Sequence, residues 1–297
     1  MKNILKTIII AFLVSISLSS QAQIKFNNMG NNIRDFKNKT TMVVLNSHNS
    51  MFDLLLKNEI KENWTISKYE FCTQEDFRKL ASDTSYYFLV KYNKSTASKS
   101  GSVLQYLTLV KGGSRKGLLY NESKKITQNL NNMASIISLP LRDDADESGN
   151  INSFLPFYIK IIQKHVQSIL DNKITAFAGM MMYSTNLEHE TDRVIFFNKK
   201  DLGLNDIDLQ NDMKLFKGKA QIVDQKTIEN VIKEKKNNVI ISLNVSPLNP
   251  HYGDENYNML INPVDGTLVY YKKTKISRRA GKGFHHLELK WLSAFYK

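Results

Sequence analysis

The stretch 68–92, KYEFCTQEDFRKLASDTSYYFLVKY, decides the fold because it has a counterpart at 220–245, AQIVDQKTIENVIKEKKNNVIISLNV. Each copy reads as a strand, a helix N-cap, an amphipathic helix and an apolar run suited to a buried strand. Thr73 and Asp224 are the predicted caps, since their side-chain oxygens can accept hydrogen bonds from the first free N–H groups of a helix. The two stretches predict one supersecondary unit used twice.

The repeat extends on both sides of this unit. The offset from Thr73 to Asp224 also relates Phe77 to Ile228 and aligns 42–45 (MVVL) with 193–196 (RVIF). A hairpin is expected after each copy: 102–110 with 118–120 in the first half, and 257–261 with 267–272, across Asp265-Gly266, in the second. Asp-Gly is a strong hairpin signal. Each half therefore predicts β-α-β-α-β-β-β, and we favour an internal duplication over a chance match of two α/β segments.

The predicted class is α/β, with α+β as the variant left open. We expect two duplicated domains, 41–185 and 190–297, joined by a polar link at 186–192, each with a mixed sheet, packed helices and a C-terminal antiparallel hairpin. The β-α-β crossovers predict parallel pairing. Residues 121–171 interrupt the symmetry and hold the longest helix, 153–170. The apolar run 174–183, ITAFAGMMMY, predicts a buried strand after it.

Residues 1–22 have the pattern of an export signal. Lys2 and Lys6 precede the apolar run 8–18, and small residues stand where signal peptidase cleaves, at Ser20 and Ala22. A retained N-terminal anchor is the alternative. Removal of the signal lowers the net charge from +13 to +11. The mature chain is expected to be exported, in the periplasm or associated with the outer membrane, without a transmembrane span; its oligomeric state stays open.

A single cysteine, Cys72, excludes an internal disulfide. It lies in a predicted strand, so a buried structural thiol is favoured over a nucleophile. The remaining composition is that of an ordinary globular protein.

The strongest charge feature is the stretch 272–286, KKTKISRRAGKGFHH, which carries six Lys or Arg and no acid. Such a stretch attracts anions. The candidate anion- or partner-binding residues are Lys272, Lys273, Lys275, Arg278, Arg279 and Lys282. The first half has a similar basic hairpin, from Lys111 through Lys125. Export argues against nucleic acid, so an envelope protein or an anionic envelope component is the expected partner. The alternative is an edge strand whose lysines only prevent aggregation.

No motif predicts a catalytic residue, a metal site or a cofactor. His285 and His286 are adjacent, so their side chains cannot converge on one ion. Residues 144–149 resemble a calcium loop only faintly, and a solvated acidic loop is favoured. An acid–base site of His251, Asp254, Glu255 and Ser246 can be imagined, but nothing in the spacing requires it.

Several aromatic stretches carry a family resemblance: 63–65 (NWT) leading into 68–71 (KYEF), 87–89 (YFL), and 266–271 (GTLVYY) followed by 275–277 (KIS). They resemble a group of uncharacterised, secreted, internally duplicated α/β proteins of Bacteroidota bacteria. The similarity covers most of the mature chain. It implies an exported envelope protein and no reaction, and its residues are structural aromatics that transfer no functional role.

These observations favour an exported, non-enzymatic binding module that uses the basic hairpin. The alternative is a periplasmic hydrolase-type enzyme with its site in the cleft between the two domains. A perturbed carboxylate in a deep interdomain cleft would favour the enzyme, whereas a flat basic surface would favour the binding module.

Overall fold

The computed structural model describes residues 33–45, 50–95, 102–113, 130, 133–142, 151–173, 179–203, 206–278 and 280–296. The predicted export signal, the acidic loop at 143–149, the basic residues from Arg115 to Lys125, and Arg279 all lie outside these ranges.

The first domain is built on a five-stranded mixed sheet. Its strand order is β2 (Lys68–Thr73), β1 (Thr40–Leu45), β3 (Tyr86–Ser95), β4 (Val103–Lys111) and β5 (Ala134–Leu141). The strand β1 is parallel to both neighbours, whereas β3–β4 and β4–β5 are antiparallel. Helix α3 (Met51–Asn63) joins β1 to β2, α4 (Gln74–Leu80) joins β2 to β3, and α6 (Ile151–Leu170) follows β5. A 3-10 turn, η1 (Phe36–Asn38), precedes β1.

The second domain repeats this order and these directions. Its sheet runs β7 (Ala220–Val223), β6 (Val194–Asn198), β8 (Val239–Val245), β9 (Glu255–Ile261) and β10 (Leu268–Lys275). The helices are α7 (Asp206–Lys214), α8 (Gln225–Glu234) and α9 (His286–Ser293). Four 3-10 segments complete it: η2 (Gly179–Ser184), η3 (Asn186–His189), η4 (Lys199–Asp201) and η5 (Ala294–Tyr296). The chain is thus an α/β protein of two similar domains, as predicted.

Both predicted helix caps are present. The Thr73 hydroxyl accepts a hydrogen bond from the Asp76 N–H at 3.1 Å, and the Asp76 carboxylate accepts one from the Thr73 N–H at 3.0 Å, which completes a capping box. The Asp224 carboxylate accepts from the Thr227 N–H at 2.8 Å. Satisfying these free N–H groups fixes where α4 and α8 begin.

The constant offset between the halves is wrong for their first strands. Val44 pairs with Cys72, directly before the Thr73 cap, whereas Asn198 pairs with Val223, directly before the Asp224 cap. By this pairing Val44 corresponds to Asn198, and by the pairing with the third strand it corresponds to Phe196, because Val44 pairs with Val90 and Phe196 with Ile241. Neither pairing selects Ile195. Sequence spacing cannot show this difference because strand register depends on contacts between distant segments.

Three further expectations are corrected. The antiparallel partner of β4 on its far side is β5, not residues 118–120, which lie outside the described ranges. Of the strand predicted at 174–183, residues 179–183 are described, and they lie in the 3-10 segment η2 (Gly179–Ser184), which lies against β10. A short apolar run indicates that a segment is buried, but it does not show whether the backbone is a strand or a helix. The long helix α6 is also not an interruption, because it follows the last strand of its sheet as α9 does.

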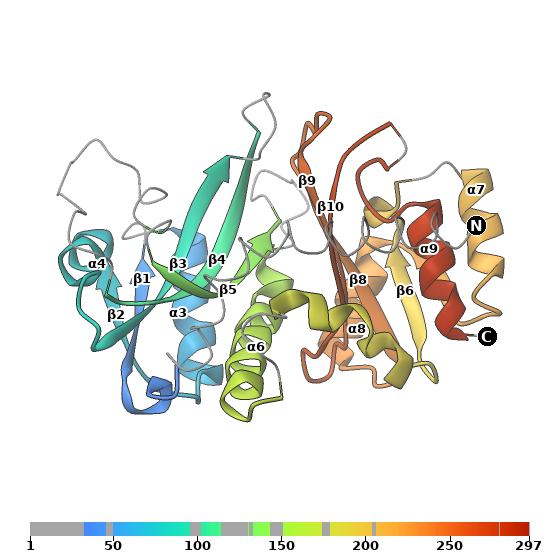
Figure 1. The fold of residues 1–297 in the computed structure, drawn as a ribbon. Helices are drawn as coiled ribbons and strands as arrows, with labels where there is room; N and C mark the ends of the chain where they lie inside the picture. The colour runs from blue at the N-terminus through green and yellow to red at the C-terminus, as the bar shows by residue number, and fades with distance from the viewer. Residues whose placement is uncertain are drawn as a thin grey trace, which may run out of the picture.

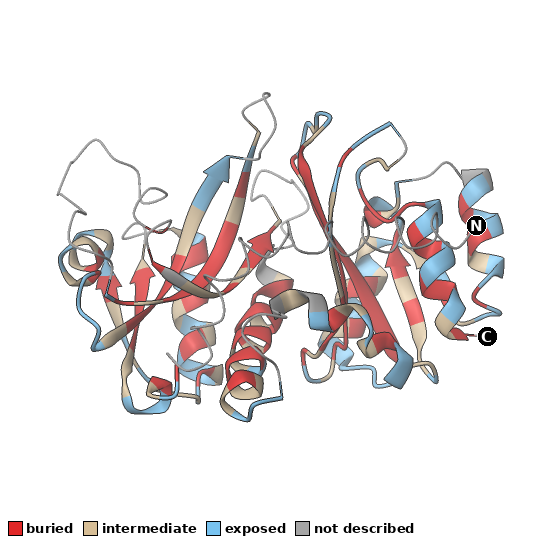
Figure 2. Ribbon diagram, in the orientation of Figure 1, coloured by how far each residue is buried: buried red, intermediate tan, exposed pale blue. Residues whose placement is uncertain are grey.

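The two domains share one core. Helices α3 and α6 cover one face of the first sheet, and α4 covers the other. Helices α7 and α9 cover the outer face of the second sheet, whereas α8 packs on the face toward the first domain. Figure 1 shows α4 at one end, α6 in the middle, and α7 and α9 at the other end. Figure 2 shows buried residues along α6, β8 and β9.

Polar contacts also cross the junction between the domains. The Tyr106 hydroxyl of β4 donates to the Glu255 carboxylate of β9 at 2.9 Å and lies 2.9 Å from the Tyr257 hydroxyl. Arg142, just after β5, forms an ion pair with the buried Asp201 and donates to the Asn244 carbonyl. Hydrophobic burial and these paired groups together hold the domains in one arrangement.

Candidate functional site

The candidate site is a groove along β10, the edge strand of the second sheet. Strand β9 pairs with one side of β10, and no strand within the described ranges pairs with the other. A groove of about 750 Å³ follows this side. It is lined by the six consecutive residues 270–275 of β10, together with Met180, Ser184 and Trp291. Its volume is within the usual range of ligand-binding clefts.

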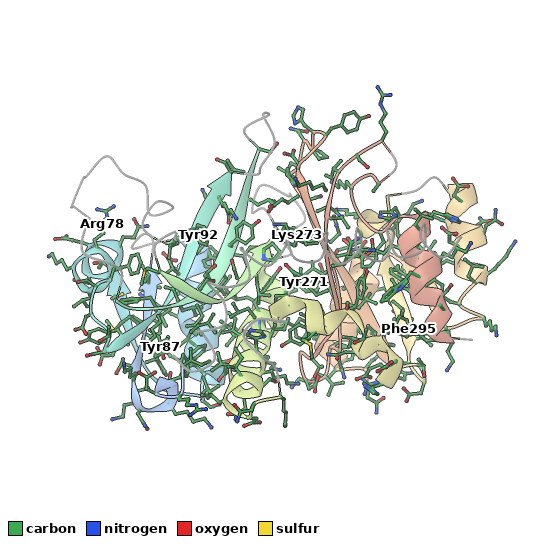
Figure 3. All side chains as sticks on the ribbon, viewed as in Figure 1. Arg78, Tyr87, Tyr92, Tyr271, Lys273 and Phe295 are labelled. Carbon is green, nitrogen blue, oxygen red and sulfur yellow. The ribbon has the colours of Figure 1, made fainter. Side chains whose placement is uncertain are left out.

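Six consecutive lining residues show that the groove faces the edge of the strand and not one of its faces. Successive side chains of a strand point to opposite faces of the sheet. Tyr270 packs into the core beneath α9, whereas Tyr271 packs into the core shared with the first domain. Figure 3 labels Tyr271 and Lys273 near the middle of the molecule, where the second domain faces the first. The side chains on the two faces of β10 have only the backbone edge of the strand between them, so this edge faces the groove.

The hydrogen bonds at the end of β10 show which backbone groups face the groove. The Ile276 N–H donates to the Asp254 carbonyl at 2.9 Å, and the Ile276 carbonyl accepts from the Gly253 N–H at 2.8 Å. Ile276 thus directs both groups toward the β9 side. Backbone direction alternates along an antiparallel ladder, and the register from Tyr270 to Lys275 has no bulge. The N–H and C=O groups of Lys273 and Lys275 therefore point outward.

The structure separates the predicted basic residues into two kinds. Lys272, Lys273 and Lys275 line the groove. The Lys273 ammonium donates to the Glu255 carboxylate at 2.5 Å, and Lys272 lies close enough to Glu288 to stabilise its charge. Lys275 and Arg278 are exposed and carry no side-chain hydrogen bond or ion pair to any described residue. These two provide the unneutralised charge at this end of the groove.

Lys282 is exposed on the loop between β10 and α9, and Arg279 of the same loop lies outside the described residues. Two glycines hold this loop against the segment after η4. The Gly203 N–H donates to the Phe284 carbonyl at 2.9 Å, and a Cβ on Gly203 would lie 1.9 Å from the Lys282 carbonyl oxygen. Gly283 has φ +84°, and a Cβ there would lie 2.4 Å from the Asp201 carbonyl oxygen. The close backbone approach therefore requires glycine at both positions.

A buried acid lies behind the α9 side of the groove. The Glu288 carboxylate is fully buried and accepts from the Tyr270 hydroxyl and the Asn258 amide, both at 2.8 Å. Burial raises the pKa of Glu288, although Lys272 opposes that shift. Burial also lowers the pKa of the neighbouring His285. Both shifts favour the neutral forms. His286 points elsewhere, to Asp212 at 2.7 Å, so the adjacent histidines do not converge.

The pKa of Glu255, at the domain junction, is shifted in the opposite direction to the pKa of Glu288. Burial raises its pKa, but hydrogen bonds from Lys273, Tyr257 and Tyr106 outweigh burial and hold the pKa below its ordinary value. Its carboxylate is ionised and well satisfied at neutral pH. This is the pattern of a structural acceptor, not of the raised carboxylate that general acid catalysis needs.

The other residues considered from the sequence do not assemble into a site. His251 is exposed, with its Nδ1 3.9 Å from Asp254, while Ser246 donates to Asn244. Cys72 is buried, as predicted, and burial raises the pKa of its thiol to about 12, so the nucleophilic thiolate is disfavoured. Among the described residues, no group of three or more His, Cys, Asp or Glu is placed to hold a metal ion. Within the ranges that the structure describes, no helix is long and apolar enough to cross a membrane.

The sequence did not reveal the apolar walls of the groove. Met180 comes from η2 and Trp291 from α9, and both reach β10 only through the tertiary fold. Trp291 is 41% exposed, and Leu287, one helical turn earlier, is 65% exposed. Leu287 and Trp291 were the available signal in the sequence. Positions on the solvent side of a helix are usually polar, so two large apolar side chains there indicate a binding surface.

A second hollow of about 410 Å³ lies between η1, the α3–β2 connection and α6. Its lining includes Lys37, Lys160 and Lys164, and the Lys164 ammonium is already paired with Asp265 at 2.7 Å.

Comparison with known proteins adds no assignment to this geometry. A scan against family models, a search of curated proteins and a search of solved structures each found no match to the chain.

Proposed function

We propose that this protein is an exported, non-enzymatic binding module that holds an anionic envelope component or partner protein in the β10 groove. The observation that carries the proposal is the composition of that groove. The lysines Lys272, Lys273 and Lys275 line one end of the groove, and the apolar side chains of Tyr270, Met180 and Trp291 line the other. Apolar walls with a few convergent charges suit a ligand that has both apolar and anionic parts.

The sequence supports the proposed cellular setting. The pattern of residues 1–22 supports export, and an exported chain with net charge +11 meets the anionic polymers, lipids and proteins of the envelope. Lys275 and Arg278 have no acidic partner among the described residues, so their charge is available to an external anion.

The test compares two charge reversals of equal size in the mature protein. One variant carries Lys275→Glu and Arg278→Glu beside the groove. The matched control carries Lys61→Glu and Lys226→Glu, two exposed lysines on α3 and α8. The probes are fluorescent poly-L-glutamate and phosphatidylglycerol vesicles. We expect at least one probe to bind, the groove variant to weaken binding about tenfold, and the control to change it little.

Higher ionic strength should weaken binding of the wild type more than binding of the groove variant. Equal losses in the two variants would show that net charge alone attracts the probes, and the groove would not be the site. Absence of binding to both probes would also contradict the proposal.

A further inference from the structure

We infer that the groove takes its partner as an added β-strand: an extended acidic and apolar polypeptide segment that pairs with the outer edge of β10. This inference rests on the proposed function and names the partner class. Edge-strand addition uses backbone hydrogen bonds for affinity and alternate side chains for specificity.

The first support is the backbone. An edge strand presents a row of unpaired N–H and C=O groups that can template another strand. Lys273 and Lys275 direct these groups outward, and the groove follows the same residues. A flat patch of lysine side chains would offer charge alone. The outward backbone groups of Lys273 and Lys275, which pair with no backbone group in the described part of the chain, can also form hydrogen bonds with an added strand.

The second support is the distribution of charge and apolar surface along the strand. The Lys275 end of the groove is followed by the exposed Arg278. At the Tyr270 end, Met180 and Trp291 supply apolar walls, and the Trp291 ring lies 5.7 Å from the Tyr270 ring. A complementary strand therefore places acidic side chains beside Lys275 and apolar side chains beside Trp291.

The same charge distribution argues against a second copy of this chain as the occupant. Pairing of β10 with β10 would bring Lys272, Lys273 and Lys275 of one molecule against the same lysines of the other. Like charges on directly opposed strand residues are unfavourable. A strand that only needed protection from aggregation would use such lysines too. Protection alone, however, does not explain an exposed Trp291 and a groove of about 750 Å³.

The experiment measures binding of defined capped hexapeptides to the mature protein. Acetyl-EEEVVF-amide presents its acids to Lys275 as an antiparallel strand, and acetyl-FVVEEE-amide does so as a parallel strand. Acetyl-KKKVVF-amide is the charge control. We expect one acidic peptide to bind and the basic peptide not to bind.

Two substitutions at one position separate backbone pairing from charge. Lys275→Ala removes the charge and keeps the outward N–H, whereas Lys275→Pro removes both. Proline is tolerated on the free side of an edge strand. We expect Lys275→Pro to weaken peptide binding about tenfold beyond Lys275→Ala, since an unpaired acceptor is left in the bound peptide. Thr274→Pro is the control for backbone direction: its N–H faces β9, so this variant should lower the melting temperature where Lys275→Pro does not.

Peptide N-methylation repeats the test without changing the protein. Methyl groups on the alternate amides that face β10 should abolish binding, whereas methyl groups on the other amides should be tolerated. Equal binding by Lys275→Pro and Lys275→Ala, or equal effects of the two methylation sets, would overturn strand addition. Binding of phosphatidylglycerol vesicles at the groove without binding of either acidic peptide would also overturn it, while leaving the proposed function intact.

Discussion

At the scale of single residues, His165 is a buried histidine with a structural role. Its Nδ1 lies 3.0 Å from the Tyr183 hydroxyl, and it is 1% exposed. Burial lowers its pKa from 6.5 to about 4. The folded state therefore holds a neutral ring at a pH where the unfolded chain takes up a proton. Stability from this group is complete above pH 6.5 and is lost as the pH falls toward 4.

The variant His165→Phe should remove this contribution to the pH dependence. Between pH 6.5 and 4, the free energy of unfolding of the wild type should fall by about 3 kcal/mol more than that of the variant. Urea denaturation at a series of pH values measures the difference. Tyr183→Phe is the control and should retain most of the wild-type slope. Parallel pH profiles for wild type and His165→Phe would contradict the assignment.

Asp201 is one of the buried acids that join the two domains. It is 1% exposed, pairs with Arg142 and accepts from the Ser242 hydroxyl at 2.7 Å. Asp201→Asn leaves the largely buried guanidinium of Arg142 without its counter-ion, so it should reduce the free energy of unfolding by about 3 kcal/mol. Glu75→Gln, which breaks the exposed pair with Lys79, should leave stability almost unchanged. Similar urea midpoints for both variants would show that the buried pair contributes no more to stability than the exposed pair.

At the scale of elements, the helix caps test whether the two repeated units are built alike. Thr73→Ala removes a cap acceptor of α4 and should cost about 1 kcal/mol of stability. Asp224→Ala removes the corresponding acceptor of α8 and should lower the melting temperature as well, whereas Asp224→Asn should preserve it because Asn is also a good N-cap. A lower melting temperature for Asp224→Asn equal to that of Asp224→Ala would contradict the capping role.

The same elements show which features of the fold could be predicted from the sequence. The caps, the amphipathic helices and the strands that follow them were predictable because their signals are local. The β4–β5 pairing and the register of β6, which excludes Ile195 as the counterpart of Val44, were not, since strand register depends on contacts between distant segments. Local charge indicated the lysines of β10. The apolar walls from Met180 and Trp291 could not be predicted, because only tertiary packing brings them to that strand.

At the scale of the whole molecule, the shared core makes the two domains one folding unit. Side chains of α6, α8 and both sheets belong to one buried cluster, and the Tyr106–Glu255 hydrogen bond crosses the junction. Because neither domain can bury its inner face alone, both should unfold in a single transition.

The two tryptophans can report on this cooperativity, since Trp64 lies in the first domain and Trp291 in the second. The variants Trp64→Phe and Trp291→Phe each leave one fluorescent reporter. In each variant, the urea midpoint from tryptophan fluorescence should coincide with the urea midpoint from circular dichroism. Tyr106→Ala in either background should lower fluorescence and dichroism midpoints together. Separate transitions for the two reporters would show independent domains.

The central claim is that the β10 groove is where this protein meets an anionic partner. The most direct measurement is photo-crosslinking in the native cell with a photoreactive residue at Thr274, in the groove, and at Lys226, on α8, as the control. We expect a defined adduct from position 274 that is lost when Lys275→Glu and Arg278→Glu are added, and no such adduct from position 226. The same adducts from both positions, or an adduct from 274 that survives the charge reversal, would contradict it.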